Sequence, residues 1–383
     1  MKLENPPWLA KAQPVFALLE GAGYQALAVG GCVRNALFGA EVADVDISTD
    51  ALPETVLALA KNAGFRAIPT GIEHGTITVV HKGEPYEITT FRKDVETDGR
   101  RAVVEFSTDI KDDALRRDFT MNALYARADG EVVDVLNGLP DLLARRLRFI
   151  ENAFERIAED HLRILRYFRF YAYYCDPAEG PDMEAIAAIA ASIDGLEALS
   201  AERVGSEMRK LLAAPNPAPA LGLMAQTHAL SRVLPGADAR FIAPLIEIES
   251  GQPLRWQRRL AALGTGEAAS LWRLSKADRK SLENIHSAME MPSLIEAGYR
   301  LGEAAAIDAM LVQCASLGLE PDPKVIRNIK AAAREVFPLK APYLMDRIPA
   351  GKALGVELKR LEKLWIESGF TLSQAALDKM VEP

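Results

Sequence analysis

The chain has 383 residues, of which 49% are hydrophobic and 26% charged, and its formal net charge at pH 7 is −8. These proportions are ordinary for a folded, water-soluble protein, and the length allows two or more domains. The apolar runs are too short to span a membrane, and Glu4 and Pro6-Pro7 stand where an export signal needs an apolar core. We therefore expect neither membrane insertion nor export.

The cysteines bear on metal binding and on the cellular compartment. Cys32, Cys175 and Cys314 are far apart and form no Cys-x-x-Cys or Cys/His cluster. This spacing argues against a structural zinc site and fits a reducing compartment. The expected location is the cytoplasm.

The arginines are unevenly distributed. A net negative charge is unfavourable for binding nucleic acid over a whole surface, because affinity comes largely from neutralising phosphates. Between residues 142 and 174, however, the sequence contains seven arginines and only four acidic residues. An anionic partner would therefore meet a local basic patch.

The first expected elements are a helix and a glycine turn. A helix is predicted over residues 8–20, interrupted near Pro14 because proline lacks the backbone N–H that a helix needs. An apolar strand then ends in Gly30-Gly31, and a short helix carrying Arg34 follows. Glycines let the backbone approach a bulky anion, and the free N–H groups at a helix start favour phosphate. This stretch predicts a phosphate-binding turn.

Two carboxylates, Asp44 and Asp46, lie in the next expected strand. Because side chains alternate along a strand, both are expected on one face, while Val45 and Ile47 point into a core. Adjacent carboxylates repel each other unless a cation lies between them, and Mg²⁺ commonly bridges protein carboxylates to substrate phosphates. The strand, turn, helix and strand together predict a magnesium site for a nucleoside triphosphate.

This unit resembles motif A of the nucleotidyltransferase superfamily that includes DNA polymerase beta. The form is the one shared by bacterial CCA-adding enzymes and poly(A) polymerases. The family usually has aspartate where this chain has Asn35. A role that requires a negative charge at that position is therefore not expected here.

The chain then continues as mixed α/β structure. A helix is predicted over 52–63, followed by strands over 65–70, 76–81 and 86–91. Residues 92–103 are polar and have no apolar period, so they are expected to form a mobile loop. CCA-adding enzymes have a flexible loop at the corresponding place, which is needed for switching to ATP.

Two further motifs lie in this part. Glu87, in the third strand, is either a water-facing glutamate or, by resemblance, the third carboxylate on the metal side. Residues 115–124 read LRRDFTMNAL, which alone could be a helix entry. They resemble the family's RRDFTxNA motif, which binds the ribose and triphosphate. In this chain the motif includes Arg117. A hairpin of strands 124–128 and 131–135 is expected to follow.

Long helices are predicted next, the first over 154–170. Asp160 and Arg163 would lie on adjacent turns of one face, either as a solvated ion pair or as groups that pair with the edge of a base. The sequence around them resembles the family's EDxxR motif, in which this pair is a protein template that selects CTP or ATP. Arg166 and Arg169 align with family residues that contact the nucleotide.

The rest of the chain carries weaker signals. A helix is expected over 199–212. Basic residues between 255 and 280 surround Trp256 and Trp272, as on a solvated helix face with core tryptophans or, alternatively, on an RNA-backbone surface. Residues 348–365 resemble the tail of bacterial CCA-adding enzymes, which reaches the elbow of tRNA.

Taken together, these motifs identify the chain as resembling class II CCA-adding enzymes. The resemblance implies an α+β fold, with a nucleotidyltransferase head over 1–141 that contains a small mixed sheet, and a helical neck over 142–212, body over 213–320 and tail over 321–383. It implies addition of C, C and A to tRNA 3′ ends from CTP and ATP, with Mg²⁺ and release of pyrophosphate, and no nucleic-acid template.

The resemblance also assigns residues. The implied metal ligands are Asp44, Asp46 and Glu87. The implied nucleotide-binding residues are Gly30, Gly31, Arg34, Arg117, Asp160, Arg163, Arg166 and Arg169.

Four alternatives stay open. They are a poly(A) polymerase, an enzyme that adds only CC or only A, a nucleotide-sugar glycosyltransferase with a metal at Asp44 and Asp46, and an RNA-binding scaffold with a degenerate site.

Overall fold

The computed structural model describes residues 1–97, 102–264 and 266–382, which form two compact units, Met1–Val233 and Leu234–Pro383. The predicted borders at residues 141, 212 and 320 fall inside these units and stay predictions. Among the described residues, no helix combines the length and hydrophobicity that crossing a membrane requires.

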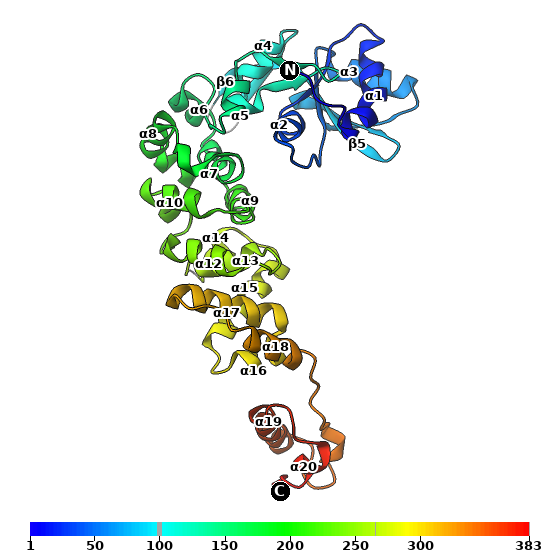
Figure 1. Cartoon of the computed structure of the whole chain (residues 1–383). Helices are drawn as coiled ribbons and strands as arrows, with labels where there is room; N and C mark the ends of the chain where they lie inside the picture. Colours follow the sequence, from blue (N-terminus) through cyan, green and yellow to red (C-terminus); the bar gives the residue numbers. More distant parts are fainter. Residues whose placement is uncertain (98–101, 265, 383) are drawn as a thin grey trace. The chain divides into compact units, whose positions relative to one another are not determined.

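The first unit contains a seven-stranded sheet of order β3-β4-β5-β2-β1-β8-β9. The strands and the helices around them are blue to cyan in Figure 1. Its strands are β1 (Ala26–Val29), β2 (Asp46–Thr49), β3 (Arg66–Gly71), β4 (Thr76–His81), β5 (Glu84–Thr90), β8 (Leu124–Ala126) and β9 (Val132–Asp134). Neighbouring strands run antiparallel, except that β2 and β5 run parallel. The mixed sheet confirms the predicted fold class.

Helices and short 3₁₀ turns connect these strands. They are α1 (Pro7–Glu20), α2 (Gly31–Phe38), α3 (Pro53–Asn62), η1 (Ile72–His74), α4 (Ile110–Leu115), η2 (Thr120–Asn122) and α5 (Leu139–Leu143). The predicted interruption near Pro14 is wrong, because α1 runs through this residue. The carbonyl that loses its partner belongs to Ala10, which is exposed, so water can satisfy it.

The predicted loop over 92–103 is also wrong in part. Strands β6 (Arg92–Thr97) and β7 (Ala102–Phe106) pair as an antiparallel ribbon separate from the main sheet. A two-stranded ribbon outside a sheet does not need a buried face, so it lacks the apolar alternation that marks most strands. Residues 98–101 of the predicted loop lie outside the described residues.

The remainder of the first unit is helical. It contains α6 (Ala153–Glu159), α7 (Leu162–Tyr174), η3 (Pro177–Glu179), α8 (Met183–Ala191), η4 (Ile193–Ala198), α9 (Ala201–Leu212), α10 (Ala218–Gln226) and α11 (Ala229–Val233). The single helix predicted over 154–170 is broken at Asp160, which has φ −154° and ψ 106°. The Asp160 carboxylate accepts the N–H of Leu162, a capping bond that favours starting a new helix.

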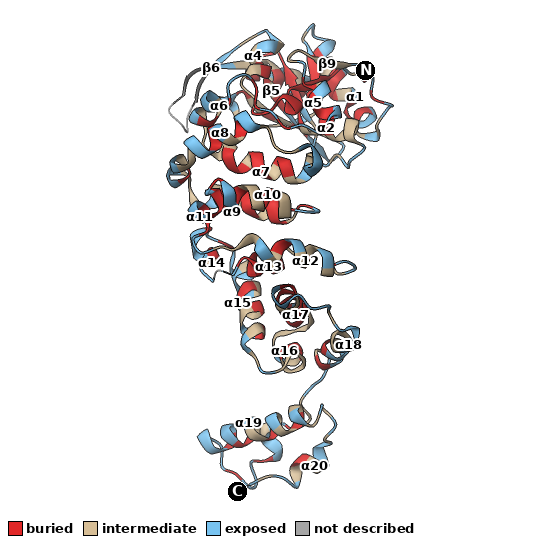
Figure 2. Cartoon of the chain, turned by 60° about the vertical axis from the view of Figure 1, so that its left-hand side comes forward, coloured by how far each residue is buried: buried red, intermediate tan, exposed pale blue. Residues whose placement is uncertain are grey.

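Aromatic side chains pack helix α7 against the part of the first unit that contains the seven-stranded sheet. Phe119 lies 4.9 Å from Phe149, 6.1 Å from Tyr167 and 5.1 Å from Phe170, measured between ring centres. All four rings are buried, and Figure 2 shows buried residues along the strands and along α7. Such pairs contribute about 0.5–1.5 kcal/mol each beyond their buried area, so this cluster fixes α7 against the sheet part.

The second unit is helical. It contains η5 (Ala239–Phe241), α12 (Ile242–Ile248), α13 (Trp256–Ala262), α14 (Ala268–Leu271), α15 (Lys276–Glu290), α16 (Leu294–Leu301), α17 (Glu303–Leu317), α18 (Pro323–Ala332), η6 (Ala341–Tyr343), α19 (Lys352–Glu367) and α20 (Gln374–Asp378). The last helices enclose a small core around Leu361, Trp365 and Leu377. Tyr299 of α16 packs on Trp365, with ring centres 5.5 Å apart.

Two arginines of the basic run in this unit are buried rather than on a surface. Arg258 donates to Asp308 and Glu249, and Arg259 donates to Glu249. Both arginines are at most 2% exposed. For these two residues, both predicted alternatives, a solvated helix face and an RNA-backbone surface, are wrong. Carboxylates from outside their helix neutralise them in the interior.

One buried ion pair joins the segment before η2 to α7. Asp118 is 7% exposed and accepts hydrogen bonds from Arg166 Nε at 2.7 Å and from Asn122 Nδ2 at 2.8 Å. Although burial opposes the shift, Arg166 and Asn122 hold the pKa of Asp118 at about 2. The folded pKa is thus below the ordinary value of 3.8.

A depressed folded pKa predicts a specific pH dependence of stability. Above pH ~4 the charged carboxylate stabilises the fold, on the order of 2 kcal/mol, and this contribution is lost as the pH falls toward 2. Asp118→Asn should therefore lower the free energy of unfolding by its largest amount at pH 6, and by progressively less below pH 4. Urea unfolding of both proteins across this range measures the difference.

The control is Asp129→Asn, since Asp129 is exposed and paired with Lys2. Its effect should be small at every pH. A difference for Asp118→Asn that stays constant from pH 6 down to the acid limit of folding would contradict the assigned pKa.

Candidate active site

The predicted carboxylates come from two adjacent strands. Asp46 opens β2 and lies opposite Glu87 of β5 in the parallel register. Asp44 precedes the strand, so the alternation argument holds for Asp46 but not for Asp44. The two strand carboxylates nevertheless lie side by side at one sheet position.

The electrostatics at Asp46 fit a cation. Desolvation and the neighbouring Glu87 and Asp44 raise the pKa of Asp46 to about 6, and Arg117 opposes the shift. The repulsion by Glu87 and Asp44 is the part of this shift that a bound cation would reverse. In the part of the chain that the structure describes, no three acidic, histidine or cysteine side chains form a ready-made metal site. Phosphate oxygens would have to complete the ligand set, as is usual for Mg²⁺.

The glycine turn forms as predicted between β1 and α2. Gly30 has φ 69°, and a Cβ added there would lie 3.3 Å from Arg117 Nη1. The position therefore favours glycine twice, through its backbone conformation and through the approach of Arg117. Gly31 begins α2, and Gly39 ends it with φ 73°.

Arg34 is held over the turn by uncharged partners. It donates to Asn122 Oδ1, to Asn35 Oδ1 at 2.9 Å and to Tyr174 Oη at 2.7 Å. It is 6% exposed, and burial lowers the pKa of its guanidinium. A buried cation whose hydrogen-bond partners are all neutral is suited to an anionic ligand.

Asn35, the departure from the family pattern, has a structural role here. Its Oδ1 accepts from Arg34, and its Nδ2 donates to the carbonyl of Glu41 at 2.9 Å. A carboxylate could accept from Arg34 but could not donate to Glu41. The amide thus connects α2 to the loop that carries Asp44.

Arg117 is oriented by Asp113 of α4 and by Ser48 of β2. Its Nη2 donates to Asp113 at 2.8 Å and to Ser48 Oγ at 3.3 Å. Asp113 is 1% exposed and also accepts from Tyr125 Oη at 2.8 Å. The guanidinium is thereby fixed next to Gly30 and near Asp46.

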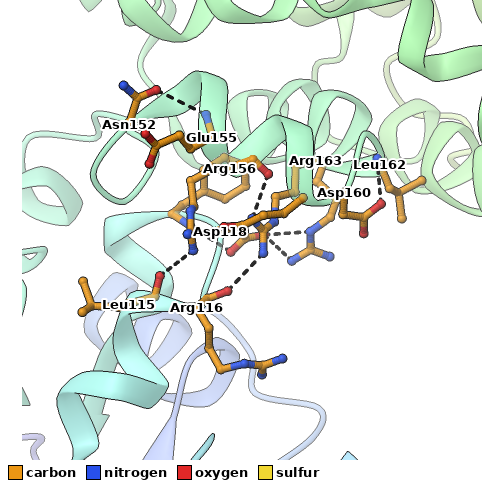
Figure 3. A network of polar contacts seen from close by, with 12 residues as sticks. Leu115, Arg116, Asp118, Asn152, Glu155, Arg156, Asp160, Leu162 and Arg163 are labelled. Atoms are coloured by element: carbon orange, nitrogen blue, oxygen red, sulfur yellow. Dashed lines mark hydrogen bonds and ion pairs between the residues drawn. The ribbon is translucent and has the colours of Figure 1, made fainter. Parts of the chain in front are cut away.

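Asp160 and Arg163 do not pair with each other. Arg163 donates to Glu159, to the Arg156 carbonyl at 2.8 Å and to the Arg116 carbonyl at 3.1 Å (Figure 3). Asp160 instead accepts from Arg203 of α9 at 2.6 Å. Of the two alternatives for this pair, the intrahelical ion pair is therefore wrong, because the helix is interrupted at Asp160 and the two side chains have other partners.

One pocket of about 530 Å³ collects most of the predicted residues. Those that line it are Gly30, Gly31, Arg34, Asp46, Arg117, Asp160, Arg163 and Arg166. Asp44 lines a neighbouring cavity of about 580 Å³ with Trp8 and Glu41. Arg169 is bonded to Glu207 of α9 at 2.6 Å.

Six further residues line the pocket that sequence reasoning did not assign. They are Arg116, Asp118, Asn122, Leu162, Phe170 and Arg203. Arg116, Asp118 and Asn122 belong to the RRDFTxNA motif, which could have indicated them. Arg203 lies on α9, 43 residues after Asp160, and its approach to Asp160 has no local sequence signal.

Sequence comparison identifies domains and relatives. The family model described as "Poly A polymerase head domain" matches residues 26–148, and the one described as "Probable RNA and SrmB- binding site of polymerase A" matches residues 181–241. The mouse protein "CCA tRNA nucleotidyltransferase 1, mitochondrial" is 30% identical over 98% of this chain and 92% of its own length. A Streptococcus pyogenes "CCA-adding enzyme" is 43% identical over 56% of this chain and 53% of its own length.

Structural comparison gives the same result. The Bacillus stearothermophilus CCA-adding enzyme, solved in complex with CTP, superimposes with a TM-score of 0.79 and 28% identity, over 95% of this chain and 94% of that one. Family membership also implies the use of a divalent metal ion. The chain thus belongs to the family of CCA-adding enzymes, the CCA tRNA nucleotidyltransferases.

Proposed function

We propose that this protein adds C, C and A to the 3′ end of tRNA from CTP and ATP, with release of pyrophosphate and without a nucleic-acid template. The observation that carries the proposal is the single pocket in which a phosphate-binding turn and Asp46 face Asp160 and Arg163. One end of this pocket suits a triphosphate and the other suits the edge of a base.

The triphosphate end combines backbone and side-chain donors. The N–H groups at the start of α2 suit phosphate oxygens, and Arg34 brings a cation whose partners are neutral. Arg117, held by Asp113, is available for the ribose or triphosphate. This end contacts groups that are common to all nucleotides, so it sets affinity and not base choice.

The base end has the donors and acceptors that distinguish C and A from U and G. Each Asp160 oxygen accepts one described hydrogen bond, from Leu162 N–H or from Arg203, and has a second lone pair. Cytosine and adenine both present an amino group that can donate to it, whereas uracil and guanine present a carbonyl oxygen there. Arg163 supplies donors for the neighbouring ring nitrogen of cytosine or adenine.

The metal is proposed to be Mg²⁺. Asp46 and Glu87, in register on β2 and β5, and Asp44 before β2 would hold it together with substrate phosphates. When bound, the metal supplies activation of the primer 3′-hydroxyl and neutralisation of the leaving pyrophosphate. The chain's own contribution is to orient the nucleotide so that its α-phosphate faces the carboxylates.

Two further assignments accompany this function. Residues 321–383 are proposed to contact the elbow of the tRNA, by family resemblance. A cytoplasmic location is proposed because Cys32, Cys175 and Cys314 are free thiols, as expected in a reducing compartment.

Stepwise incorporation tests the function. Purified protein is incubated with Mg²⁺, single nucleotides and tRNA transcripts that end before CCA, after C and after CC. We expect two C residues and then one A, each on the matching transcript. Long A tracts on any RNA would assign poly(A) polymerase activity instead, and addition of only CC or only A would restrict the function.

Removal of Asp44 should separate chemistry from binding. Asp44→Ala should abolish addition of every nucleotide and leave tRNA affinity within about twofold, because an exposed carboxylate adds little to the fold. Glu41→Ala is the matched control, since Glu41 is an exposed carboxylate of the same loop and should retain activity. Loss of tRNA binding along with activity would refute a catalytic role for Asp44.

Asp160→Asn should change base choice. An amide can donate to the O4 of uracil, so the preference for CTP over UTP in kcat/KM should fall about 10- to 100-fold. The matched control is Asp176→Asn, because Asp176 likewise accepts the backbone N–H two residues on and lies outside the pocket-lining set. An equal loss for CTP, ATP, UTP and GTP would contradict the template role.

A further inference from the structure

Phe170 lines the pocket among several arginines. It is 4% exposed, lines the pocket from α7 and packs against Phe119 and Tyr174, with ring centres 5.1 Å and 5.4 Å away. Neighbouring rings therefore fix its orientation. The side chain has no hydrogen-bonding group and is almost fully buried, so an effect on the polar phosphates of a ligand would act through other residues.

Three arginine side chains converge on this ring. The guanidinium carbon lies 5.0 Å from the ring centre for Arg34, 5.4 Å for Arg166 and 4.6 Å for Arg169. Arg34 comes from α2, whereas Arg166 and Arg169 come from α7. The ring thus connects the cation of the glycine turn to those of the neighbouring helix.

Each of the three guanidinium groups has a different hydrogen-bond partner. Arg166 is bonded to Asp118 at 2.7 Å, Arg169 to Glu207 at 2.6 Å, and Arg34 to neutral groups such as Tyr174 Oη. Phe170 is the contact that all three share. A change in its ring would therefore affect the three arginines together.

The charges of this group do not cancel. Three guanidiniums face two carboxylates, Asp118 and Glu207, which leaves one positive charge close to Arg34. Burial lowers the pKa of Arg34, Asp118 opposes this shift, and Arg169 adds to it. The negative face of an aromatic ring attracts cations, by about 0.5–1 kcal/mol each at exposed sites and more where water is excluded. The ring can thus hold the arginines close together in the absence of an anion.

We propose that Phe170 is a positioning residue that sets the arrangement of Arg34, Arg166 and Arg169 and thereby the affinity of the pocket for the triphosphate of any incoming nucleotide. The inference rests on the proposed function and extends it to a residue outside the proposed metal ligands and the proposed base-selecting pair. Its consequence is a loss of affinity that is the same for CTP and ATP.

The test replaces the ring by an aliphatic side chain. Phe170→Leu keeps the site apolar and removes the cation–π contacts. We expect KM to rise about tenfold for CTP and for ATP alike, with a much smaller change in kcat and an unchanged preference over UTP and GTP. Inorganic triphosphate, as a competitive inhibitor, should weaken by the same factor. Phe170→Tyr keeps an aromatic ring and should restore most of the affinity.

The matched control is Phe168→Leu on the same helix. Phe168 is fully buried and packs edge-to-face on Tyr167, and over the described residues no guanidinium lies over its ring. Both leucine variants should lose similar stability in thermal unfolding, but Phe168→Leu should keep the wild-type KM. Equal KM changes in both variants, or a base-dependent change in Phe170→Leu, would overturn the proposal.

A second readout separates this inference from the proposed function. Calorimetric titration with CTP and Mg²⁺, without tRNA, measures nucleotide affinity directly. Weaker binding by Phe170→Leu than by Phe168→Leu supports the positioning role even if the wild-type protein fails to add CCA, which would refute the proposed function alone. Equal affinities of the two variants would overturn the positioning role even if the wild type adds CCA in order.

Discussion

The buried ion pair between Asp118 and Arg166 is the interaction on which the site depends. Asp118 is the last residue of the RRD segment, and Arg166 lies in the middle of α7. Arg156 and Arg163 reinforce this junction by donating to the carbonyls of Leu115 and Arg116 (Figure 3). Because these bonds tie the helices to the motif that carries Arg117, the two ends of the pocket keep a fixed separation, as selection of a nucleotide requires.

The arginines of the site differ in whether their hydrogen-bond partners are charged. Arg166 and Arg169 have carboxylate partners, whereas Arg34 has neutral ones. On the other side, Asp46 and Glu87 repel each other. The protein alone therefore leaves a cation unpaired at one end and carboxylates in repulsion at the other. A nucleoside triphosphate with its metal would relieve both, so ligand affinity follows from the electrostatics of the unliganded fold.

Local patterns predicted much of this structure. The strand over 76–81 and the turn at Gly30-Gly31 depend mainly on neighbouring residues, and both formed as expected. The sequence-based predictions were wrong where the position of a side chain depends on a partner that is distant in the sequence. Asp160 pairs with Arg203 and Arg258 with Asp308, 43 and 50 residues away, and neither contact leaves a periodic signal. Asp160 ends α6, and its carboxylate accepts the N–H of Leu162 at the start of α7, an interruption that the helical pattern of residues 154–170 does not reveal.

A crystal structure of the protein with CTP and Mg²⁺ tests the central claim most directly. The account predicts the triphosphate against the Gly30-Gly31 turn and Arg34, the cytosine edge facing Asp160 and Arg163, and the metal at Asp44 and Asp46. CTP in the neighbouring cavity lined by Trp8 and Glu41 would contradict it. So would a cytosine that points away from α7.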